Sequence, residues 1–239
     1  MEQLAGRVAL VTGAGSGLGW ATSRLLAREG VVTGLLSRRA EPLRQLAAEI
    51  GKQHALPLPA DVRDPAAVAA AVQQLVAAAG RLDILIYCAG VGRYGPVESY
   101  PLEAWRETLD TNVTGLFLCS QAALPHLRLR GGQIVAISSG AGRRGYANLA
   151  AYSASKFAVM GYMESLAEEA GPLGVRCTTL LPGSMLTEFG PSSREEKERL
   201  RAEGVGKKYL DPEALAAIIL QVLRQPADVW TQQLNVWPF

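Results

Sequence analysis

Seven short apolar runs, separated by longer segments with helical periodicity, constrain the fold of this chain more than any other feature. The runs are almost continuously apolar, as is typical of parallel strands that are buried on both faces. They are Val8–Val11, Val31–Leu36, His54–Pro59, Leu82–Cys88, Gln133–Ser138, Val175–Leu181 and Trp230–Val236. Right-handed crossovers between such strands place helices on both faces of the sheet. The pattern predicts an α/β fold with one doubly wound, seven-stranded parallel sheet.

The segments between these runs have the periodicity expected of helices. The predicted helices are Leu18–Glu29, Glu41–Ile50, Pro65–Ala79, Leu102–Leu129, Ala151–Ala170 and Pro212–Leu223. Asp64 and Asp211 each precede a proline, which predicts an N-cap followed by proline at the first helical position. Pro125 should bend or end the long helix. Because no repeat or linker interrupts the alternation, residues 1–239 are predicted to form a single domain.

Composition excludes several classes of protein. Hydrophobic residues make up 49% of the chain, which excludes bulk disorder. The net charge is +2 and the basic residues are scattered, so we expect no nucleic-acid partner. The three widely spaced cysteines favour a reducing compartment without disulfides. Two distant histidines make a metal site improbable. No signal-peptide pattern and no apolar run of about 18 residues occur, so we expect a soluble, cytoplasmic protein without a membrane partner.

The glycine-rich segment Thr12–Gly19 lies between the first predicted strand and the first predicted helix. Gly13, Gly17 and Gly19 permit a tight turn, close approach of the backbone to a pyrophosphate, and close helix–strand packing. The helix that follows offers N–H groups and the positive end of its dipole to phosphates. This context predicts a dinucleotide site, although a glycine-rich turn can also exist without a ligand.

The end of the second predicted strand should distinguish the two nicotinamide cofactors. A carboxylate at this place binds the ribose 2′-hydroxyl of NAD, whereas an arginine accommodates the 2′-phosphate of NADP. Here Ser37 is followed by Arg38 and Arg39. We therefore predict NADP(H) in preference to NAD(H), the alternative being that one or both arginines are only surface charges. Asp61 and Val62, after the third strand, are placed to meet the adenine ring.

Tyr152 and Lys156 are four residues apart, which on a helix places both side chains on one face. A nearby ammonium favours the phenolate form, so Lys156 is expected to lower the pKa of Tyr152 toward neutrality. The hydroxyl of Ser139 lies 13 residues upstream of Tyr152. Together these groups predict an acid–base site.

With Thr12–Gly19, Asn112, Ser139, Tyr152 and Lys156 in this order, the chain resembles the short-chain dehydrogenase/reductase family over Gly6 to Thr187. The resemblance implies a Rossmann-type fold and the catalytic residues Asn112, Ser139, Tyr152 and Lys156, with Ser138 as an alternative to Ser139. The implied cofactor-binding residues are Gly13, Gly15, Ser16, Gly17, Leu18, Gly19, Ser37, Arg38, Arg39, Asp61, Val62, Cys88, Ala89, Gly90, Tyr152, Lys156, Pro182, Gly183, Met185 and Thr187.

The reaction implied is hydride transfer between a nicotinamide and a carbonyl or secondary alcohol. Tyr152 would give a proton to the carbonyl oxygen, which Ser139 would position. Lys156 would hold the nicotinamide ribose, and Asn112 would support a water that links Lys156 to solvent. For Asn112 a purely structural hydrogen bond inside a helix is the alternative.

The chain departs from the family pattern after the fourth strand, where Asn-Asn-Ala-Gly is usual. Tyr87-Cys88-Ala89-Gly90 stands here, so the hydrogen bonds that the missing asparagine makes in the sheet must be replaced. Ala89 and Gly90 still leave room for a ribose. We interpret Cys88 as a small hydrophobic residue rather than a reactive thiol.

The substrate pocket should be lined by loops 91–100 and 140–151 and by a polar, glycine-punctuated segment, residues 184–210, which we call the flap. A short charged helix is expected in the flap near Arg194–Glu203, within a mixed-charge run from Ser193 to Lys208 that we interpret as solvated. The candidate substrate-binding residues are Tyr94, Ser139, Ala141, Tyr146, Met185 and Phe189. Most are apolar or aromatic, which suits a neutral carbonyl compound, and we interpret Arg143 and Arg144 as solvated.

Two other functions remain open. One is a 3-oxoacyl-[acyl-carrier-protein] reductase, for which Arg143 and Arg144 are the only hint and against which the missing Asp-Gly-Gly ending speaks. The other is a dinucleotide-sensing regulator, which would not need the Tyr152–Lys156 pair. Trp230 and Trp237 near the C-terminus either pack a last strand or form an intersubunit contact. Family resemblance implies a homo-oligomer, a tetramer or a dimer.

Overall fold

Seven parallel strands form one sheet in the order β3-β2-β1-β4-β5-β6-β7. The computed structural model describes residues 3–204 and 206–239. The strands are β1 (Val8–Thr12), β2 (Val32–Ser37), β3 (Ala55–Pro59), β4 (Ile84–Tyr87), β5 (Gln133–Ile137), β6 (Arg176–Pro182) and β7 (Gln233–Val236). Each predicted run forms a strand, with ends displaced by at most three residues. The predicted seven-stranded, doubly wound parallel sheet is confirmed.

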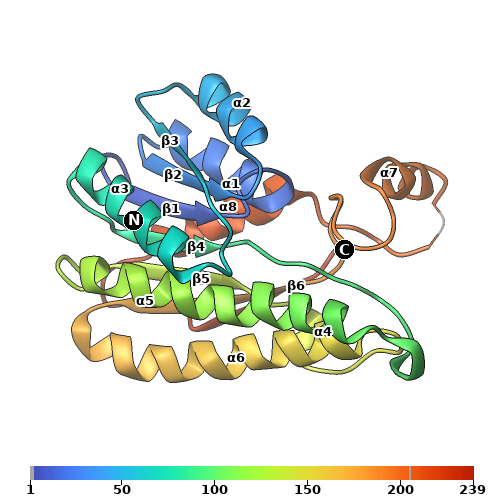
Figure 1. Ribbon diagram of the computed structural model, residues 1–239. Coiled ribbons are helices and arrows are strands. Elements are labelled where there is room, and N and C mark those ends of the chain that lie inside the picture. Colours follow the sequence, from blue (N-terminus) through green and yellow to red (C-terminus); the bar gives the residue numbers. More distant parts are fainter. Residues whose placement is uncertain (1–2, 205) are drawn as a thin grey trace.

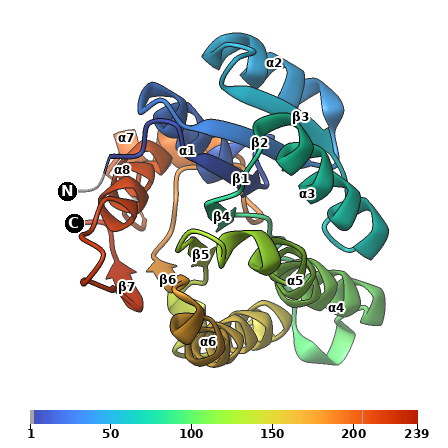
Figure 2. The same ribbon diagram turned by 90° about the vertical axis from the view of Figure 1, so that its left-hand side faces the viewer.

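Helices cover both faces of this sheet (Figures 1 and 2). One face carries α1 (Gly17–Arg28), α2 (Ala40–Ile50) and α8 (Pro212–Leu223); the other carries α3 (Pro65–Ala79), α5 (Gly115–Leu127) and α6 (Ala150–Ala170). Alternate residues of β1 enter the two cores: Leu10 packs with the α3–α5–α6 layer and Val11 with the α1–α2–α8 layer. Both cores are therefore built from every second residue of the central strands.

The long helix predicted over Leu102–Leu129 is interrupted. It consists of α4 (Leu102–Leu109), a π-helical turn (Asp110–Thr114) and α5. The hydroxyl of Tyr87 donates a hydrogen bond of 2.5 Å to the carbonyl oxygen of Thr111, in the wide turn. A π-turn in an α-helix is frequent at functional sites. Pro125 lies within α5, which ends two residues later at Leu127.

The two predicted Asp-Pro helix starts differ in detail. Asp64 caps α3 by accepting hydrogen bonds from the backbone N–H groups of Ala66 and Ala67, at 2.9 and 3.1 Å. Asp211 makes no side-chain cap bond to α8. Its carboxylate instead pairs with Arg201, 3.0 Å away. That arginine belongs to α7 (Arg194–Ala202), the short charged helix predicted in the flap.

The strand order reverses between β1 and β4, because β2 and β3 lie on one side of β1 and β4 to β7 on the other. The loops that leave the carboxyl ends of these two strands diverge there and open a crevice, which is where ligands bind in sheets of this type. Ala89 is held at this place by a 3.1 Å hydrogen bond from its N–H to the hydroxyl of Thr12. The topology thus brings the glycine-rich turn beside the segment that follows β4.

Candidate active site

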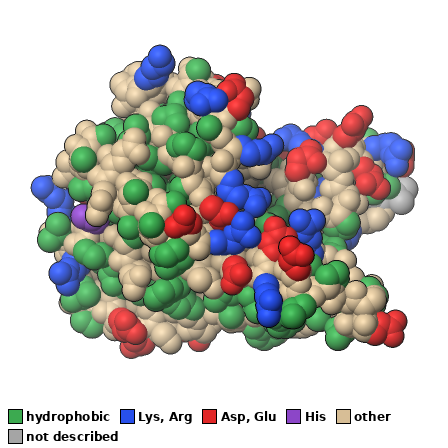
Figure 3. Space-filling view, in the orientation of Figure 1, with side chains coloured by type: hydrophobic (Ala, Val, Ile, Leu, Met, Phe, Trp, Pro, Cys, Tyr) green, Lys and Arg blue, Asp and Glu red, His purple; other side chains and the backbone are tan. Residues whose placement is uncertain are grey.

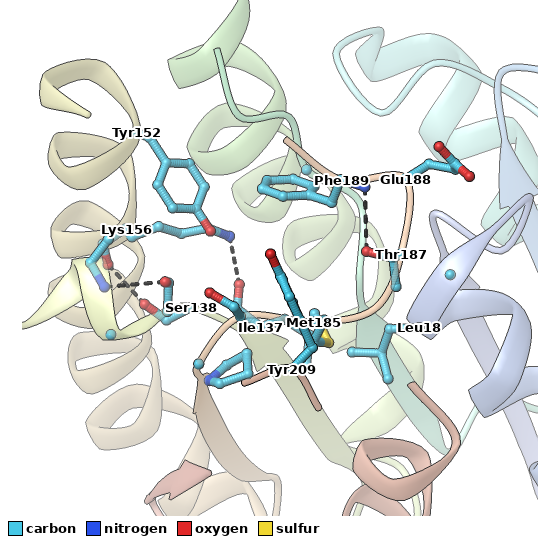
Figure 4. Close-up of a pocket in the computed structure, with 18 of the residues that line it drawn as sticks. Leu18, Ile137, Ser138, Tyr152, Lys156, Met185, Thr187, Glu188, Phe189 and Tyr209 are labelled. Atoms are coloured by element: carbon cyan, nitrogen blue, oxygen red, sulfur yellow. Dashed lines mark hydrogen bonds between the residues drawn. The ribbon is translucent and has the colours of Figure 1, made fainter. Parts of the chain in front are cut away.

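A cavity of about 800 Å³ opens at this crevice (Figure 4). Its wall combines the glycine-rich turn, the ends of β4 and β5, the start of α6, the flap and the C-terminal residues Trp237 and Pro238. The cavity therefore joins the predicted phosphate-binding turn and the predicted acid–base residues in one site.

Tyr152 and Lys156 project from successive turns of α6 and are 8% and 5% exposed. The ammonium of Lys156 donates a 2.7 Å hydrogen bond to the carbonyl oxygen of Ile137, at the end of β5. Its nitrogen lies 5.6 Å from the centre of the Tyr152 ring. The strand end thus holds the lysine below the phenol, as Figure 4 shows.

Burial controls the protonation of both groups. It raises the pKa of Tyr152 well above the ordinary tyrosine value, and the neighbouring hydroxyl of Ser139 only partly opposes this shift. The expectation that Lys156 lowers the pKa of Tyr152 is wrong for this structure, because loss of solvent around the phenol is the larger effect. Burial also lowers the pKa of Lys156, to about 8. The site therefore holds a neutral phenol above an ammonium that titrates in the mildly alkaline range.

The two adjacent serines after β5 have different partners. The hydroxyl of Ser138 donates a 3.1 Å hydrogen bond to the carbonyl oxygen of Lys156 and is buried with α6. Ser139 accepts a 3.1 Å hydrogen bond from the N–H of Ala141 and is the serine paired with Tyr152. This geometry favours Ser139 over Ser138 as the serine that meets a substrate oxygen.

Asn112 lies in the π-helical turn and does not line the cavity. Its carbonyl oxygen accepts from the N–H of Val91 at 2.8 Å, and its amide donates to the oxygen of Val91 at 3.0 Å and to Ser155 at 2.9 Å. The side chain therefore joins three elements: the helix break, the loop after β4, and α6. These contacts agree with the structural alternative for the side chain.

Tyr87 and Cys88 stand where the family usually has two asparagines, and nothing in the sequence marks Tyr87 as a positioning group. It is 2% exposed, and its hydroxyl lies against Gly115, where a β-carbon would collide with it. Tyr87 thus reaches across to Thr111 only because residue 115 is a glycine. Beside it, burial raises the pKa of the Cys88 thiol to about 12, which supports the interpretation of this cysteine as a small hydrophobic residue.

The glycine-rich turn fits a dinucleotide phosphate. Ser16, the N-cap of α1, is extended and makes no side-chain cap bond, so the first N–H groups of this helix remain available to an anion. A β-carbon on Gly13 would lie 2.9 Å from the backbone nitrogen of Ala89. Gly17 has φ +54°, and a β-carbon on it would lie 3.2 Å from the methyl group of Thr187. Both positions require glycine if the turn is to stay this close to its neighbours.

Most predicted cofactor-binding residues line the cavity. These are Gly13, Ser16, Gly17, Leu18, Gly19, Cys88, Ala89, Gly90, Tyr152, Lys156, Pro182, Gly183, Met185 and Thr187. The others lie outside it, near the carboxyl ends of β2 and β3: Gly15, Ser37, Arg38, Arg39, Asp61 and Val62. These six residues therefore form a second group, outside the cavity that holds Tyr152 and Lys156.

The second group contains exposed charges. Arg38 and Arg39 are both exposed. Asp61 forms a 2.6 Å ion pair with Arg63, which is the main cause of its lowered pKa, and Arg38 lies near enough to lower it further. Val62 is buried against Gly115. Basic and acidic side chains mix on the face drawn in Figure 3.

All six predicted substrate-binding residues line the cavity: Tyr94, Ser139, Ala141, Tyr146, Met185 and Phe189. The rings of Tyr94 and Phe189 flank Tyr152, with centroids 6.2 and 5.6 Å from its own. Aromatic side chains therefore surround the phenol on two sides.

Two further wall residues are polar or exposed. Arg144 lines the cavity and donates a 2.8 Å hydrogen bond to the hydroxyl of Tyr146. Trp237, which the sequence did not connect with the site, packs on the backbone of Gly140 and Gly183; β-carbons there would lie 2.8 and 3.0 Å from its ring. Trp230, by contrast, donates to the carbonyl oxygen of Cys177 at 2.7 Å, so it packs against β6.

The described residues contain no cluster of acidic, histidine and cysteine side chains that could hold a metal ion. In the same part of the chain, no helix is both long enough and apolar enough to cross a membrane. All three cysteines are free thiols.

Known proteins share this architecture. The short chain dehydrogenase family matches residues 7–198. An uncharacterized oxidoreductase of Staphylococcus haemolyticus is 35% identical over the full length of both chains. The 2-dehydro-3-deoxy-L-rhamnonate dehydrogenase (NAD(+)) of a Sphingomonas strain is 40% identical and aligns with 75% of this chain and 72% of its own.

A solved structure supports the same relationship. The short-chain dehydrogenase of Burkholderia cenocepacia, in complex with NADP, superposes with a TM-score of 0.88 at 32% identity and covers 98% of both chains. Fold, site and relatives together define an oxidoreductase that binds a nicotinamide dinucleotide and acts on alcohol groups. The chain belongs to the short-chain dehydrogenase/reductase family.

Proposed function

We propose that this protein is an NADP(H)-dependent ketoreductase that interconverts a small neutral carbonyl compound and its secondary alcohol. The observation on which the proposal rests is the cavity that contains Ser139, Tyr152 and Lys156 together with the phosphate-binding turn. When bound, the nicotinamide supplies or accepts the hydride.

The raised pKa of Tyr152 suits the direction of reduction. A phenol that stays protonated at neutral pH can donate its proton to the oxygen of a substrate carbonyl. Ser139, which lines the cavity with Tyr152, orients the same oxygen. Lys156 stabilises the phenolate that Tyr152 leaves behind, and this favourable interaction exists only when the reaction has occurred.

Asn112 acts indirectly in this scheme. Its side chain is fully engaged with Val91 and Ser155, so it fixes the helix break and the loop after β4 relative to α6. Ala89, Gly90, Pro182, Gly183 and Thr187 form the wall that would hold the nicotinamide half of the cofactor. Asn112 is therefore a positioning residue.

Preference for NADP(H) rests on Arg38. Arg38 is exposed at the carboxyl end of β2, where a guanidinium can donate two parallel hydrogen bonds to a phosphate. Asp61, a carboxylate that follows β3, is already paired with Arg63, so it is less available to a ribose hydroxyl. The NADP complex of the Burkholderia relative agrees with this assignment, whereas the Sphingomonas relative is named for NAD(+).

The test is a binding and turnover experiment with the purified protein. NADPH and NADH affinities would be measured by fluorescence titration, followed by oxidation of each with ketones, diketones, sugars and acyl thioesters. Tighter binding of NADPH and turnover of a ketone are expected. Preference for NADH would contradict the role of Arg38. Turnover only of acyl thioesters would favour an acyl-carrier-protein reductase, with Arg144 at the cavity rim, and NADPH binding without any turnover would favour a regulator.

A further inference from the structure

The flap contains a buried lysine that the reaction does not use. Lys197 is 6% exposed, and it is the only buried residue of α7, although Leu200 on the same helix is half-buried. A helix normally docks by an apolar face, and lysine is among the residue types least often buried. Helix α7 therefore packs against the rest of the molecule through a buried lysine instead of a mainly apolar face.

The ammonium of Lys197 has two acceptors, both from the flap backbone. It donates hydrogen bonds of 2.6 Å to the carbonyl oxygens of Thr187 and Phe189. Because a buried charge is costly unless its hydrogen bonds are satisfied, these carbonyls have to stay near the ammonium as long as the lysine is buried. These two hydrogen bonds therefore keep Lys197 and the turn at residues 187–189 together.

This turn belongs to the active site. The hydroxyl of Thr187 accepts a 3.3 Å hydrogen bond from the N–H of Phe189, and the Phe189 ring lies 5.6 Å from that of Tyr152 (Figure 4). Thr187 also faces Gly17 of the phosphate-binding turn. A shift of the 187–189 turn would therefore change both the wall around the phenol and the wall beside the cofactor phosphates.

The base of the flap is fixed independently of Lys197. Leu186 donates a 2.9 Å backbone hydrogen bond to Leu210, and Leu210 donates one of 2.8 Å to Ser184. Arg201 pairs with Asp211 at the same end. Other charges of α7 pair along its exposed surface, as Arg194 does with Glu198 at 2.8 Å. Lys197 is thus the cation of α7 that points inward and orders the segment between the fixed ends.

We propose that Lys197 is a positioning residue that holds the Thr187–Phe189 turn over the active site, so that the flap is ordered before substrate arrives. The structural part of this claim needs no reaction; its effect on catalysis rests on the proposed ketoreductase function. Lys197 lines the cavity but is committed to backbone carbonyls, so it is expected to affect binding more than the chemical step.

The test replaces Lys197 by methionine, which keeps the length of the side chain without its donors. The matched control is Arg199→Met, which removes a cation from an exposed position of the same helix. Amide hydrogen exchange of the protein without cofactor should be at least about tenfold faster over residues 186–204 in Lys197→Met, with exchange of the sheet unchanged. Arg199→Met should exchange like the unmodified protein.

Kinetics give the second measurement. The dissociation constant of NADPH and the KM of a ketone should each rise by about ten- to hundredfold in Lys197→Met, with a smaller change in kcat, because two charge-assisted hydrogen bonds are lost. Lys197→Gln, which retains one donor group, should be intermediate and replaces the methionine variant if that variant does not fold.

Equal exchange in Lys197→Met and Arg199→Met would overturn the positioning role. Faster exchange with unchanged NADPH affinity and KM would overturn its connection with the active site. If the unmodified protein turns over none of the tested carbonyl compounds, the proposed function fails, while the exchange experiment still decides whether Lys197 orders the flap.

Discussion

In the proposed function, the two ends of the cofactor crevice use charge in opposite ways. At the nicotinamide end, Lys156 is buried, and the backbone of Ile137 fixes its ammonium. At the adenosine end, Arg38 and Arg39 are exposed beyond the cavity. Interactions of a buried charge are little screened by salt, whereas those of an exposed charge are weakened by it. The buried end is therefore suited to chemistry, and the exposed end to a choice between two cofactors.

The same difference in burial determines which substitutions affect the catalytic site or the fold and which affect neither. Replacing Lys156 or Tyr152 alters a site whose burial sets the pKa values of both groups. Replacing Arg38 alters only a solvated side chain, so the fold should be unaffected. The following predictions test this separation, beginning with the largest expected effect.

Removing the hydroxyl of Tyr152 should abolish catalysis without loss of cofactor binding. Tyr152→Phe is expected to lower kcat by about 10²- to 10⁴-fold, the usual contribution of a positioned acid or base. Tyr162→Phe, in the same helix but outside the cavity, is the control and should keep its turnover. Steady-state kinetics and NADPH titration measure both. Turnover near that of the unmodified protein in Tyr152→Phe would refute the assignment of the acid.

Removing the charge of Arg38 should change cofactor preference only. Arg38→Leu is expected to raise the KM of NADPH by about ten- to hundredfold and to leave that of NADH unchanged, since the lost hydrogen bonds to phosphate are charge-assisted. Arg39→Leu is the matched control and separates the two arginines. Raising the salt concentration should weaken NADPH binding in the unmodified protein more than in Arg38→Leu. An unchanged NADPH preference in both variants would show that neither arginine contacts the 2′-phosphate.

The pH dependence of reduction should reveal Lys156. Burial lowers its pKa to about 8, so the ammonium is present below this pH and is lost above it. Tyr152 keeps its proton over the same range because its own pKa is raised. The kcat/KM for NADPH is therefore expected to be flat from about pH 6 to 7.5 and to fall above about pH 8. A rate that stays flat to about pH 10 would contradict a requirement for the charged lysine.

Removing the hydroxyl of Tyr87 tests the link between the sheet and the helix break. Tyr87→Phe leaves the carbonyl oxygen of Thr111 without this donor in a partly buried place, which should lower the free energy of unfolding by about 1–3 kcal/mol. Urea denaturation measures this loss. A several-fold decrease in kcat is expected as well, because Asn112 lies next to Thr111 in the same π-helical turn. Unchanged stability and kcat would show that Tyr87 only fills space.

Sequence periodicity predicted the sheet well because each strand is a run of buried residues, and buried runs leave a direct signal. The glycine-rich turn and the Tyr152–Lys156 pair were equally accessible, since their chemistry depends on local spacing. The helix break at Asp110–Thr114 could not be predicted from the sequence, because it involves Tyr87, which is 24 residues away from Thr111 in the chain. Only a long-range contact reveals that interruption.

Two errors of interpretation have the same physical origin. The pKa of Tyr152 was expected to fall because the sequence shows a neighbouring cation but not the extent of burial. The mixed-charge run around Lys197 predicts a solvated segment because its immediate neighbours are charged, whereas the lysine itself is buried. In both cases the burial of the side chain decides the outcome. The residues next to it in the sequence do not show how far it is buried.

Trp237 gives this molecule an internal optical probe. Its indole lines the cavity beside Gly140 and Gly183, close to where a reduced nicotinamide would lie. Indole emission overlaps the absorption band of NADPH, so excitation of the protein should transfer energy to the bound dinucleotide. Quenched indole light and sensitised nicotinamide light would then report occupancy directly, and Trp237→Phe would show how much of that signal originates at the cavity wall.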